Sequence, residues 1–111
     1  MKKNIYLEFS TEEAELLVEV FSGYLENVNK LQLKLPGIDI DFEEAEFVAD
    51  SLILLKDAVD MEIGVILQCK IAIKKVLFSL ALLTANYANE ENDRLNTSCI
   101  IKLLHAAQDG E

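Results

Sequence analysis

An apolar stretch of this sequence, residues 61–89, has the length and composition of a helix that is apolar around most of its circumference. On a helical wheel its polar side chains fall on one narrow line. That line consists of Gln68, Lys75, Ser79 and Asn86. A helix of this kind must be covered on most sides by the rest of the protein. We therefore expect a buried central helix over residues 61–88, with Asp60 as its N-cap.

The charges in this stretch argue against a membrane-spanning helix, which needs about 20 apolar residues with few charges. Its longest uncharged run is Val76–Asn89, and three lysines interrupt the residues before it. The first nine residues also lack the long apolar core of a signal peptide. We expect a cytoplasmic protein without membrane contact. Cys69 and Cys99 both fall in helical patterns and are expected to be reduced, although spacing alone leaves a disulfide open.

Capping boxes predict two more helices. Ser10 with Glu13 opens the first, and Asp41 with Glu44 opens the second. A last helix follows the Asn-rich segment after the central stretch, with Gly110 as its C-terminal stop. We expect residues 1–111 to form a single, compact, mainly all-α domain of four helices packed around the third. The approximate ranges of these helices are 11–30, 42–58, 61–88 and 94–107.

A short strand is predicted at Asn4–Phe9, where apolar and polar residues alternate. The other alternating stretch is Leu31–Ile40, which contains Pro36-Gly37 as a candidate type II turn. These two stretches would pair in a very small N-terminal β patch. Alternatively, Leu31–Leu33 would be the end of the first helix.

The tetrapeptide Glu-Glu-Ala-Glu occurs twice, at residues 12–15 and 43–46. A tandem duplication would produce such a repeat. We favour a simpler explanation, because acidic residues suit the first turn and the outer face of any surface helix. No third copy follows in the chain.

The net charge of −10 is distributed unevenly along the chain. Residues 35–62 carry nine acidic residues and one lysine, whereas residues 63–89 carry three lysines and no acid. Such a field repels nucleic acid and anionic membranes and attracts basic proteins. The alternative is that the acidity serves solubility alone.

Patterns for catalysis, metals and cofactors are missing from the sequence. The single histidine, His105, is predicted near the end of a helix. We expect a structural role for it there rather than that of a general base that activates a nucleophile. Two cysteines without a second histidine do not make a zinc site, and no Glu-x-x-His pair indicates a di-iron bundle. The four scattered glycines form no phosphate-binding loop. We expect no enzymatic activity, no metal and no cofactor.

One acidic cluster partly matches the calcium-binding loop pattern. Asp39, Asp41, Glu43 and Asp50 fall at its positions 1, 3, 5 and 12. Glu44 stands at position 6, where the loop needs glycine for a sharp turn. A capped helix start explains the same residues, and we favour that interpretation.

Acidic side chains line the outer faces of the first two predicted helices, opposite their apolar seams. Like charges packed this closely repel one another, and a basic partner would relieve that repulsion. Affinity also needs apolar anchors, for which Phe47, Leu54 and Tyr24 are candidates because they lie off the main seams. The alternative is a purely solvated face. The predicted partner-binding residues are Glu12, Glu15, Glu19, Glu26, Asp39, Asp41, Glu43, Glu46, Phe47, Asp50 and Asp57.

In size, acidity and predicted helicity the chain resembles the bacterial immunity proteins and antitoxins that block basic nuclease toxins. The resemblance implies a cytoplasmic inhibitor of a basic protein, without direct binding of nucleic acid. One alternative is a phage- or host-encoded regulator that mimics nucleic acid charge and blocks a nucleic-acid-binding enzyme. Another is a helical self-assembly or scaffold module. We expect a monomer rather than a homodimer, because the last helix has an apolar face that can cover the side chains flanking the polar line, which are Leu67, Ile71, Phe78 and Leu82.

Overall fold

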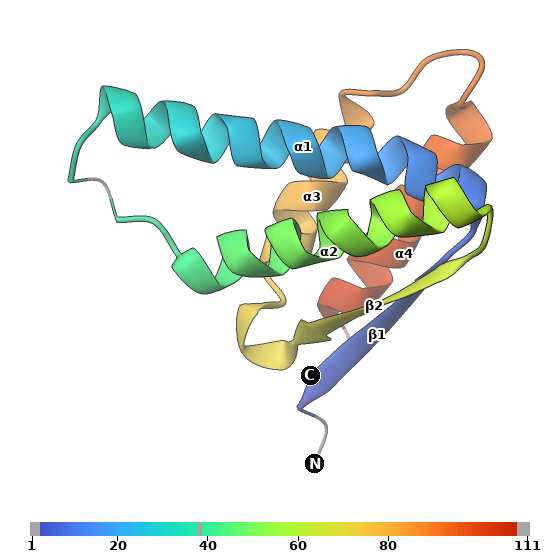
Figure 1. Cartoon of the computed structure of the whole chain (residues 1–111), viewed down its shortest axis with the longest axis horizontal. Helices are drawn as coiled ribbons and strands as arrows, with labels where there is room; N and C mark the ends of the chain where they lie inside the picture. The colour runs from blue at the N-terminus through green and yellow to red at the C-terminus, as the bar shows by residue number, and fades with distance from the viewer. Residues whose placement is uncertain (1–2, 38, 109–111) are drawn as a thin grey trace.

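The chain begins with a strand, folds into two long antiparallel helices, returns along the first strand and ends in two further helices (Figure 1). The computed structural model describes residues 3–37 and 39–108. Its elements are β1 (Asn4–Phe9), α1 (Thr11–Lys34), α2 (Phe42–Met61), β2 (Val65–Lys70), the 3-10 turn η1 (Ile71–Ile73), α3 (Val76–Ala85) and α4 (Asp93–Gln108). The predicted mainly helical fold, with four helices and a small β patch, is confirmed for these residues.

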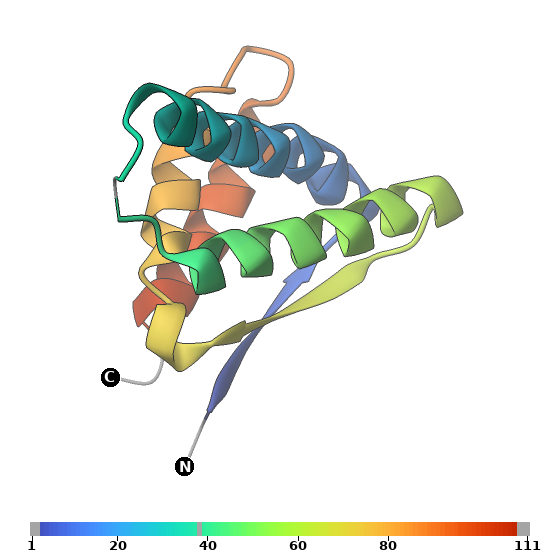
Figure 2. The same cartoon turned by 60° about the vertical axis from the view of Figure 1, so that its left-hand side comes forward.

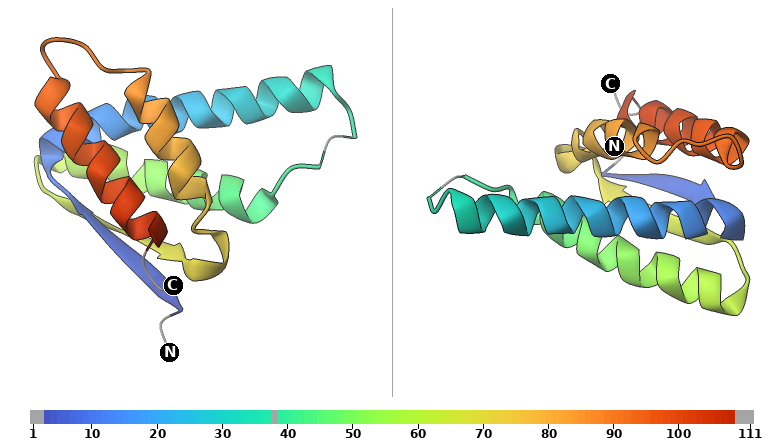
Figure 3. Two further views of the ribbon diagram at one scale, coloured as in Figure 1. Left: turned by 180° about the vertical axis from the view of Figure 1, so that it is seen from behind. Right: turned by 90° about the horizontal axis from the view of Figure 1, so that it is seen from above.

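Helix α1 occupies the middle of the molecule, so the prediction that the helices pack around the third one is wrong. It packs against α2 on one side and against α3 and α4 on the other, as the view from above in Figure 3 shows. The two-stranded sheet runs below α2 in the view of Figure 2, and its strands contact α1, α2 and α4. All these elements therefore share one buried core. Its fully enclosed side chains include Phe9, Phe21, Leu55, Leu77 and Leu103.

The predicted central helix over residues 61–88 is wrong in its first half. Residues 65–73 form β2 and η1, and only the second half of the stretch is helical, as α3. Burial in β2 alternates, because Leu67 and Cys69 are buried whereas Gln68 between them is exposed. This period of two fits a strand, whose backbone groups are satisfied by pairing with β1.

In the described ranges, no helix is long and apolar enough to cross a membrane.

Strand β1 pairs antiparallel with β2, so its predicted pairing with residues 31–40 is wrong. In the observed register Ile5 lies opposite Cys69, and Leu7 lies opposite Leu67. These four side chains point into the core from one face of the sheet. The apolar alternation of β1 therefore meets a matching alternation in β2, whereas residues 31–34 are part of α1.

Residues 31–34 continue α1, which is the alternative that the sequence left open. Their side chains are exposed because this end of α1 extends beyond the core. Gly37 then adopts a φ of 96°, as the third position of a type II turn requires. Ile38, the predicted fourth position of that turn, lies outside the described residues.

The predicted capping box of α1 is confirmed, and Gly23 in the same helix has a packing role. The Ser10 hydroxyl accepts a hydrogen bond from the Glu13 N–H, and the Glu13 carboxylate accepts one from the Ser10 N–H at 2.8 Å. At Gly23, an added Cβ would lie 2.5 Å from the hydroxyl oxygen of Tyr87. The close approach at this glycine is therefore made by one aromatic side chain, which lies after the end of α3.

Helix α2 starts at its predicted cap, where the Asp41 carboxylate accepts hydrogen bonds from the N–H groups of Glu43 and Glu44. It continues to Met61, and Glu62 ends it in the left-handed conformation with a φ of 56°. Asp60 thus lies inside α2, and its predicted role as the cap of another helix is wrong. The last predicted helix is confirmed as α4, whereas its predicted stop, Gly110, lies outside the described residues.

The outer face of α3 is not covered by α4. Phe78 is 41% exposed and Leu82 is 74% exposed, although α3 and α4 pack against each other. The prediction that the last helix covers these two side chains is wrong. Helix α4 lies on another side of α3, where the Asn96 side chain donates a hydrogen bond to the Thr84 carbonyl at 2.8 Å.

Candidate partner-binding groove

A groove of about 290 Å³ lies between α2 and β2. One wall is formed by α2, and the other by alternate side chains on the exposed face of β2, which all point to the same side. Four predicted partner-binding residues line this α2–β2 groove, together with two exposed aliphatic side chains. These six residues are Glu43, Glu46, Phe47, Asp50, Leu54 and Ile66.

The groove also has apolar side chains in its lining. Phe47, a predicted anchor, is only 8% exposed and therefore belongs to the core as well as to the groove. Ser51, one turn further along α2, is buried too, so the buried face of α2 includes a polar side chain. Leu54 is 48% exposed and Ile66 60%, and they offer apolar surface to a ligand from opposite walls.

The wall formed by α2 is acidic. Glu43, Glu46 and Asp50 stand three and four residues apart, a spacing that places them on one side of a helix. Asp41 fixes where that helix begins and therefore which side the three carboxylates occupy. The opposite wall contributes one cation, Lys70. The groove thus keeps an excess of negative charge beside its apolar side chains.

All ten predicted carboxylates are exposed, but the structure brings only three of them into this groove. The four on α1, Glu12 to Glu26, do not line it. Asp57 lies further along α2, and Asp39 precedes the helix. Asp41 serves as the N-cap, which gives this member of the calcium-loop pattern a structural role.

Tyr24, another predicted anchor, is partly buried in an acidic environment near the start of α2. Burial raises the pKa of Tyr24, and the charges of Glu44 and Asp41 raise it further. Burial also raises the pKa of the Glu44 carboxyl, an effect that Asp41 strengthens and Lys75 opposes. Negative charge is therefore crowded where α2 begins, and added positive charge there would be favourable.

A buried carboxylate that sequence reasoning treated only as a cap joins α1 to α4. The Glu13 carboxylate accepts hydrogen bonds from the Ser98 hydroxyl and, at 2.6 Å, from Lys102 Nζ. Burial disfavours its charge, but hydrogen bonds from Lys102, Ser10 and Ser98 and the Lys102 charge outweigh this effect and lower the pKa of Glu13. Ser98 and Lys102 carry no sequence pattern that links them to a residue so distant in the chain.

The two cysteines are buried and are not joined in a disulfide. Cys69 lies on β2, so its predicted helical position is wrong, whereas Cys99 lies on α4. Burial and nearby carboxylates raise the pKa of Cys69 to about 11 and that of Cys99 to about 12. Neither thiol is therefore activated as a nucleophile at neutral pH. Across residues 3–37 and 39–108, no three His, Cys, Asp or Glu side chains are grouped to hold a metal ion.

No protein-family model matches this chain, and neither a curated protein nor a solved structure is significantly similar to it. No relative therefore supplies an activity or a partner that could be carried over to the α2–β2 groove. The geometry and charge of the molecule itself are the basis for a functional proposal.

Proposed function

We propose that this protein is a small acidic binding protein that holds a basic segment of a protein partner in the α2–β2 groove. One observation supports this most directly. Three carboxylates on one side of α2 stand beside apolar surface in a single groove. Charge alone would suit many solvated helices, but carboxylates combined with accessible Leu54 and Ile66 offer a ligand both steering and affinity.

The two kinds of residue have different tasks in this proposal. The acidic rows of α1 and α2 attract a basic partner from a distance and raise the association rate, an effect that salt weakens. In the complex, ion pairs to Glu43, Glu46 and Asp50 inside the groove slow dissociation. Burial of an aliphatic or aromatic partner side chain against Leu54 and Ile66 slows it further. Full burial of such a side chain contributes about 1.5–3 kcal/mol.

The partner class that suits this surface best is a basic enzyme that itself binds nucleic acid, with a nuclease-type toxin as the leading candidate. Such enzymes expose lysines and arginines that contact phosphates. A protein that covers these cations with carboxylates acts as an immunity protein or antitoxin. A regulator that mimics nucleic acid charge would use the same contacts against a different nucleic-acid-binding enzyme. Both versions predict competition between this protein and nucleic acid.

Two charge-reversal variants with equal net charge test the proposal. Glu43, Glu46 and Asp50 are changed to Lys in one, and Glu12, Glu15 and Glu19 in the other. A partner is first captured from the native host, and association and dissociation rates are then measured at several salt concentrations. We expect the groove variant to lose binding by at least tenfold, with faster dissociation. The α1 variant should retain the dissociation rate and lose only association rate at low salt.

Equal effects of the two variants on dissociation would exclude the groove as the binding site. Unchanged rates and salt dependence in both variants would exclude the acidic surface altogether, provided that both remain folded by circular dichroism. Competition with nucleic acid distinguishes an inhibitor of a nuclease from a binder of some other basic protein.

A second candidate function, self-association, is supported by the exposed Phe78 and Leu82 on α3. Two copies that meet along this face would bury both side chains. We propose the monomer as the working state, because the net charge of −10 opposes association of two copies. Light scattering at micromolar concentration tests this. A stable dimer that Phe78→Asp dissociates without unfolding would establish the scaffold alternative.

A further inference from the structure

The outer edge of β1 presents backbone groups that point away from β2. The Ile71 N–H donates a hydrogen bond to the Lys3 carbonyl at 3.1 Å, which identifies these residues as a hydrogen-bonded pair of the antiparallel ladder. Such pairs recur at every second residue, so Ile5, Leu7 and Phe9 also bond to β2. The N–H and C=O groups of the residues between them point outward instead. These residues are Asn4, Tyr6 and Glu8.

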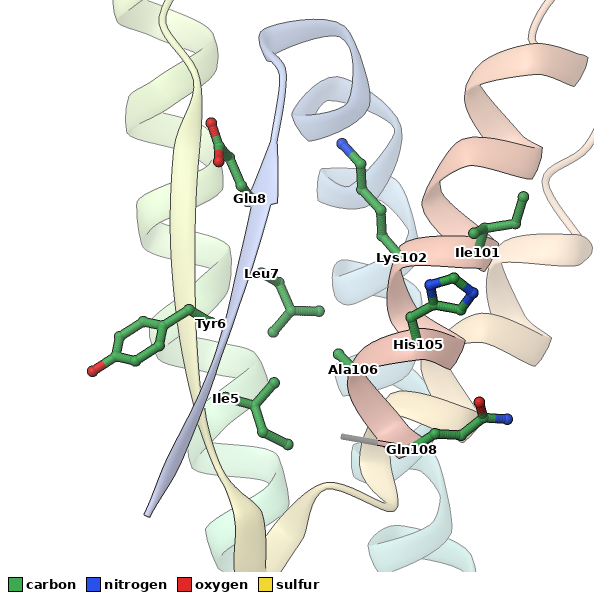
Figure 4. Close-up of a pocket in the computed structure, with 9 residues that line it drawn as sticks. All are labelled: Ile5, Tyr6, Leu7, Glu8, Ile101, Lys102, His105, Ala106 and Gln108. Carbon is green, nitrogen blue, oxygen red and sulfur yellow. The ribbon is translucent and has the colours of Figure 1, made fainter. Parts of the chain in front are cut away.

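A groove of about 600 Å³ runs along this edge, between β1 and α4 (Figure 4). Four consecutive residues of β1, Ile5–Glu8, line it. Successive side chains of a strand point to opposite faces, so a cavity that touches four in a row follows the edge of the strand. Across the groove, Ala106 points toward β1 and His105 lies beside it on α4 (Figure 4). Within the described residues, β2 is the only strand beside β1.

We propose that this β1–α4 groove binds an extended peptide segment of a partner protein, which adds to β1 as a third strand. Strand addition of this kind obtains affinity from main-chain hydrogen bonds, which the outward groups of Asn4, Tyr6 and Glu8 are oriented to make. About five peptide residues, at roughly 3.3 Å each, match the length from Asn4 to Glu8. The sheet would gain a third strand, and two-stranded sheets are marginal by themselves.

The side chains around the edge specify the chemistry of the peptide. Alternate peptide side chains would face α4, where Ile101 and Ala106 favour small or aliphatic residues. The others would lie on the exposed face of the sheet beside Tyr6, which is 66% exposed, and Glu8. A basic residue directly across from Glu8 is favoured there. The preferred peptide therefore alternates aliphatic with polar or basic residues.

Charge selects such a peptide over a second copy of this chain. Lys102 does not neutralise Glu8, because its Nζ lies 2.6 Å from the buried Glu13 carboxylate and 5.5 Å from the ring centre of Phe9. A second copy would also bring another net charge of −10 to the same edge. A basic segment reduces that charge, whereas self-pairing doubles it.

The test uses the whole chain and a displayed library of random nine-residue peptides. We expect enrichment of alternating aliphatic and basic sequences that bind one chain each. Hydrogen exchange should show fast exchange of the Asn4, Tyr6 and Glu8 amides in the unliganded protein. An enriched peptide should slow their exchange at least tenfold, while the amides of Ile5 and Leu7 are protected throughout. N-methylation at alternate peptide positions should abolish binding in one register and spare it in the other.

Two protein variants complete the experiment. Tyr6→Pro removes one outward N–H and leaves the hydrogen bonds between β1 and β2 in place, so binding should fall at least tenfold. Because proline can unfold a strand, Glu8→Lys provides an independent test. It should shift the library toward acidic peptides, whereas Glu12→Lys, with the same net charge, should not.

Three outcomes would overturn the inference. They are a library without an enriched alternating pattern, amides of Asn4, Tyr6 and Glu8 already protected in the unliganded protein, and enriched peptides that are indifferent to N-methylation at every position. The variant in which Glu43, Glu46 and Asp50 are changed to Lys distinguishes failure of this inference from failure of the proposed function. It should bind the enriched peptides normally, even though it fails to bind the basic partner.

Discussion

The Nζ atom of Lys102 lies 2.6 Å from Oε1 of Glu13, a carboxylate that also caps the helix to which it belongs. The Glu13 side chain is only 5% exposed, whereas that of Lys102 is 41% exposed. One buried carboxylate thus accepts a hydrogen bond from the N-cap of α1 and binds a lysine of α4. The ion pair and its hydrogen bonds should therefore contribute to stability more than an exposed surface pair does.

Replacement of Glu13 by Gln should lower the free energy of unfolding by about 1–3 kcal/mol, because it leaves charged and polar partners poorly satisfied. Urea unfolding at pH 7 measures this. Glu12→Gln is the matched control, since Glu12 is exposed in the same turn, and it should change stability by less than about 0.5 kcal/mol. Equal effects of the two substitutions would contradict a structural role for the Glu13 network.

The lowered pKa of Glu13 makes stability dependent on pH in the acidic range. The unfolded state takes up a proton on this carboxyl at a higher pH than the folded state does. The stability that it contributes is therefore complete above the ordinary glutamate pKa and is lost as the pH falls through the lowered folded pKa. Unfolding measured between pH 7 and pH 3 should show a shallower loss in Glu13→Gln than in the natural chain.

Glu44 should behave in the opposite way, because burial and Asp41 raise its pKa in the folded state. Its ionised form is disfavoured by folding at neutral pH, so Glu44→Gln should raise the free energy of unfolding at pH 7. The advantage should shrink as the pH falls and the natural glutamate becomes protonated. The same urea series measures it. A loss of stability at pH 7 would mean that the attraction of Glu44 to Lys75 dominates.

The raised pKa values of Cys69 and Cys99, about 11 and about 12, predict thiols that resist alkylation. At pH 8 both should remain protonated and buried, so iodoacetamide should label the folded protein at least a hundredfold more slowly than the unfolded one. Mass spectrometry after timed labelling, with and without urea, measures the difference. Rapid labelling of Cys69 alone would indicate that β2 separates easily from the core.

The close approach of Gly23 and Tyr87 predicts a substitution whose sign depends on its partner. Alanine at position 23 would improve helix propensity by up to about 1 kcal/mol. Its Cβ would lie 2.5 Å from the Tyr87 hydroxyl oxygen but 3.6 Å from the ring carbon that carries it. We expect Gly23→Ala to destabilise the natural chain and to stabilise the Tyr87→Phe variant. Thermal unfolding of the four proteins in this cycle measures the sign in each background.

The sequence was sufficient to predict the helices that begin with a local signal. Ser10 and Asp41 cap α1 and α2 through contacts within three residues, so local reasoning placed both helix starts correctly. Strand β2 has no such signal, because Val65–Lys70 is apolar enough for a buried helix as well as for a strand. The choice between them depends on pairing with β1, which lies far earlier in the chain.

The same limit applies to the candidate site. Exposure of Glu43, Glu46 and Asp50 follows from helical periodicity and was predicted. Their position beside Ile66 was not, because it requires β2 to run alongside α2. The partnership of Glu13 with Lys102 likewise depends on how α4 packs on α1, which no spacing in the sequence encodes.

The pairing of β1 with β2 has a consequence for the order of events during synthesis. The first strand leaves the ribosome about 3–12 s before the second at ordinary translation rates of about 5–20 residues per second. Helices α1 and α2 are neighbours in the chain and can dock during that interval, since short loops close readily. During that interval β1 has no strand to pair with, and its apolar side chains Ile5, Leu7 and Phe9 remain uncovered by β2. We expect β1 to remain accessible to chaperones until β2 has been made.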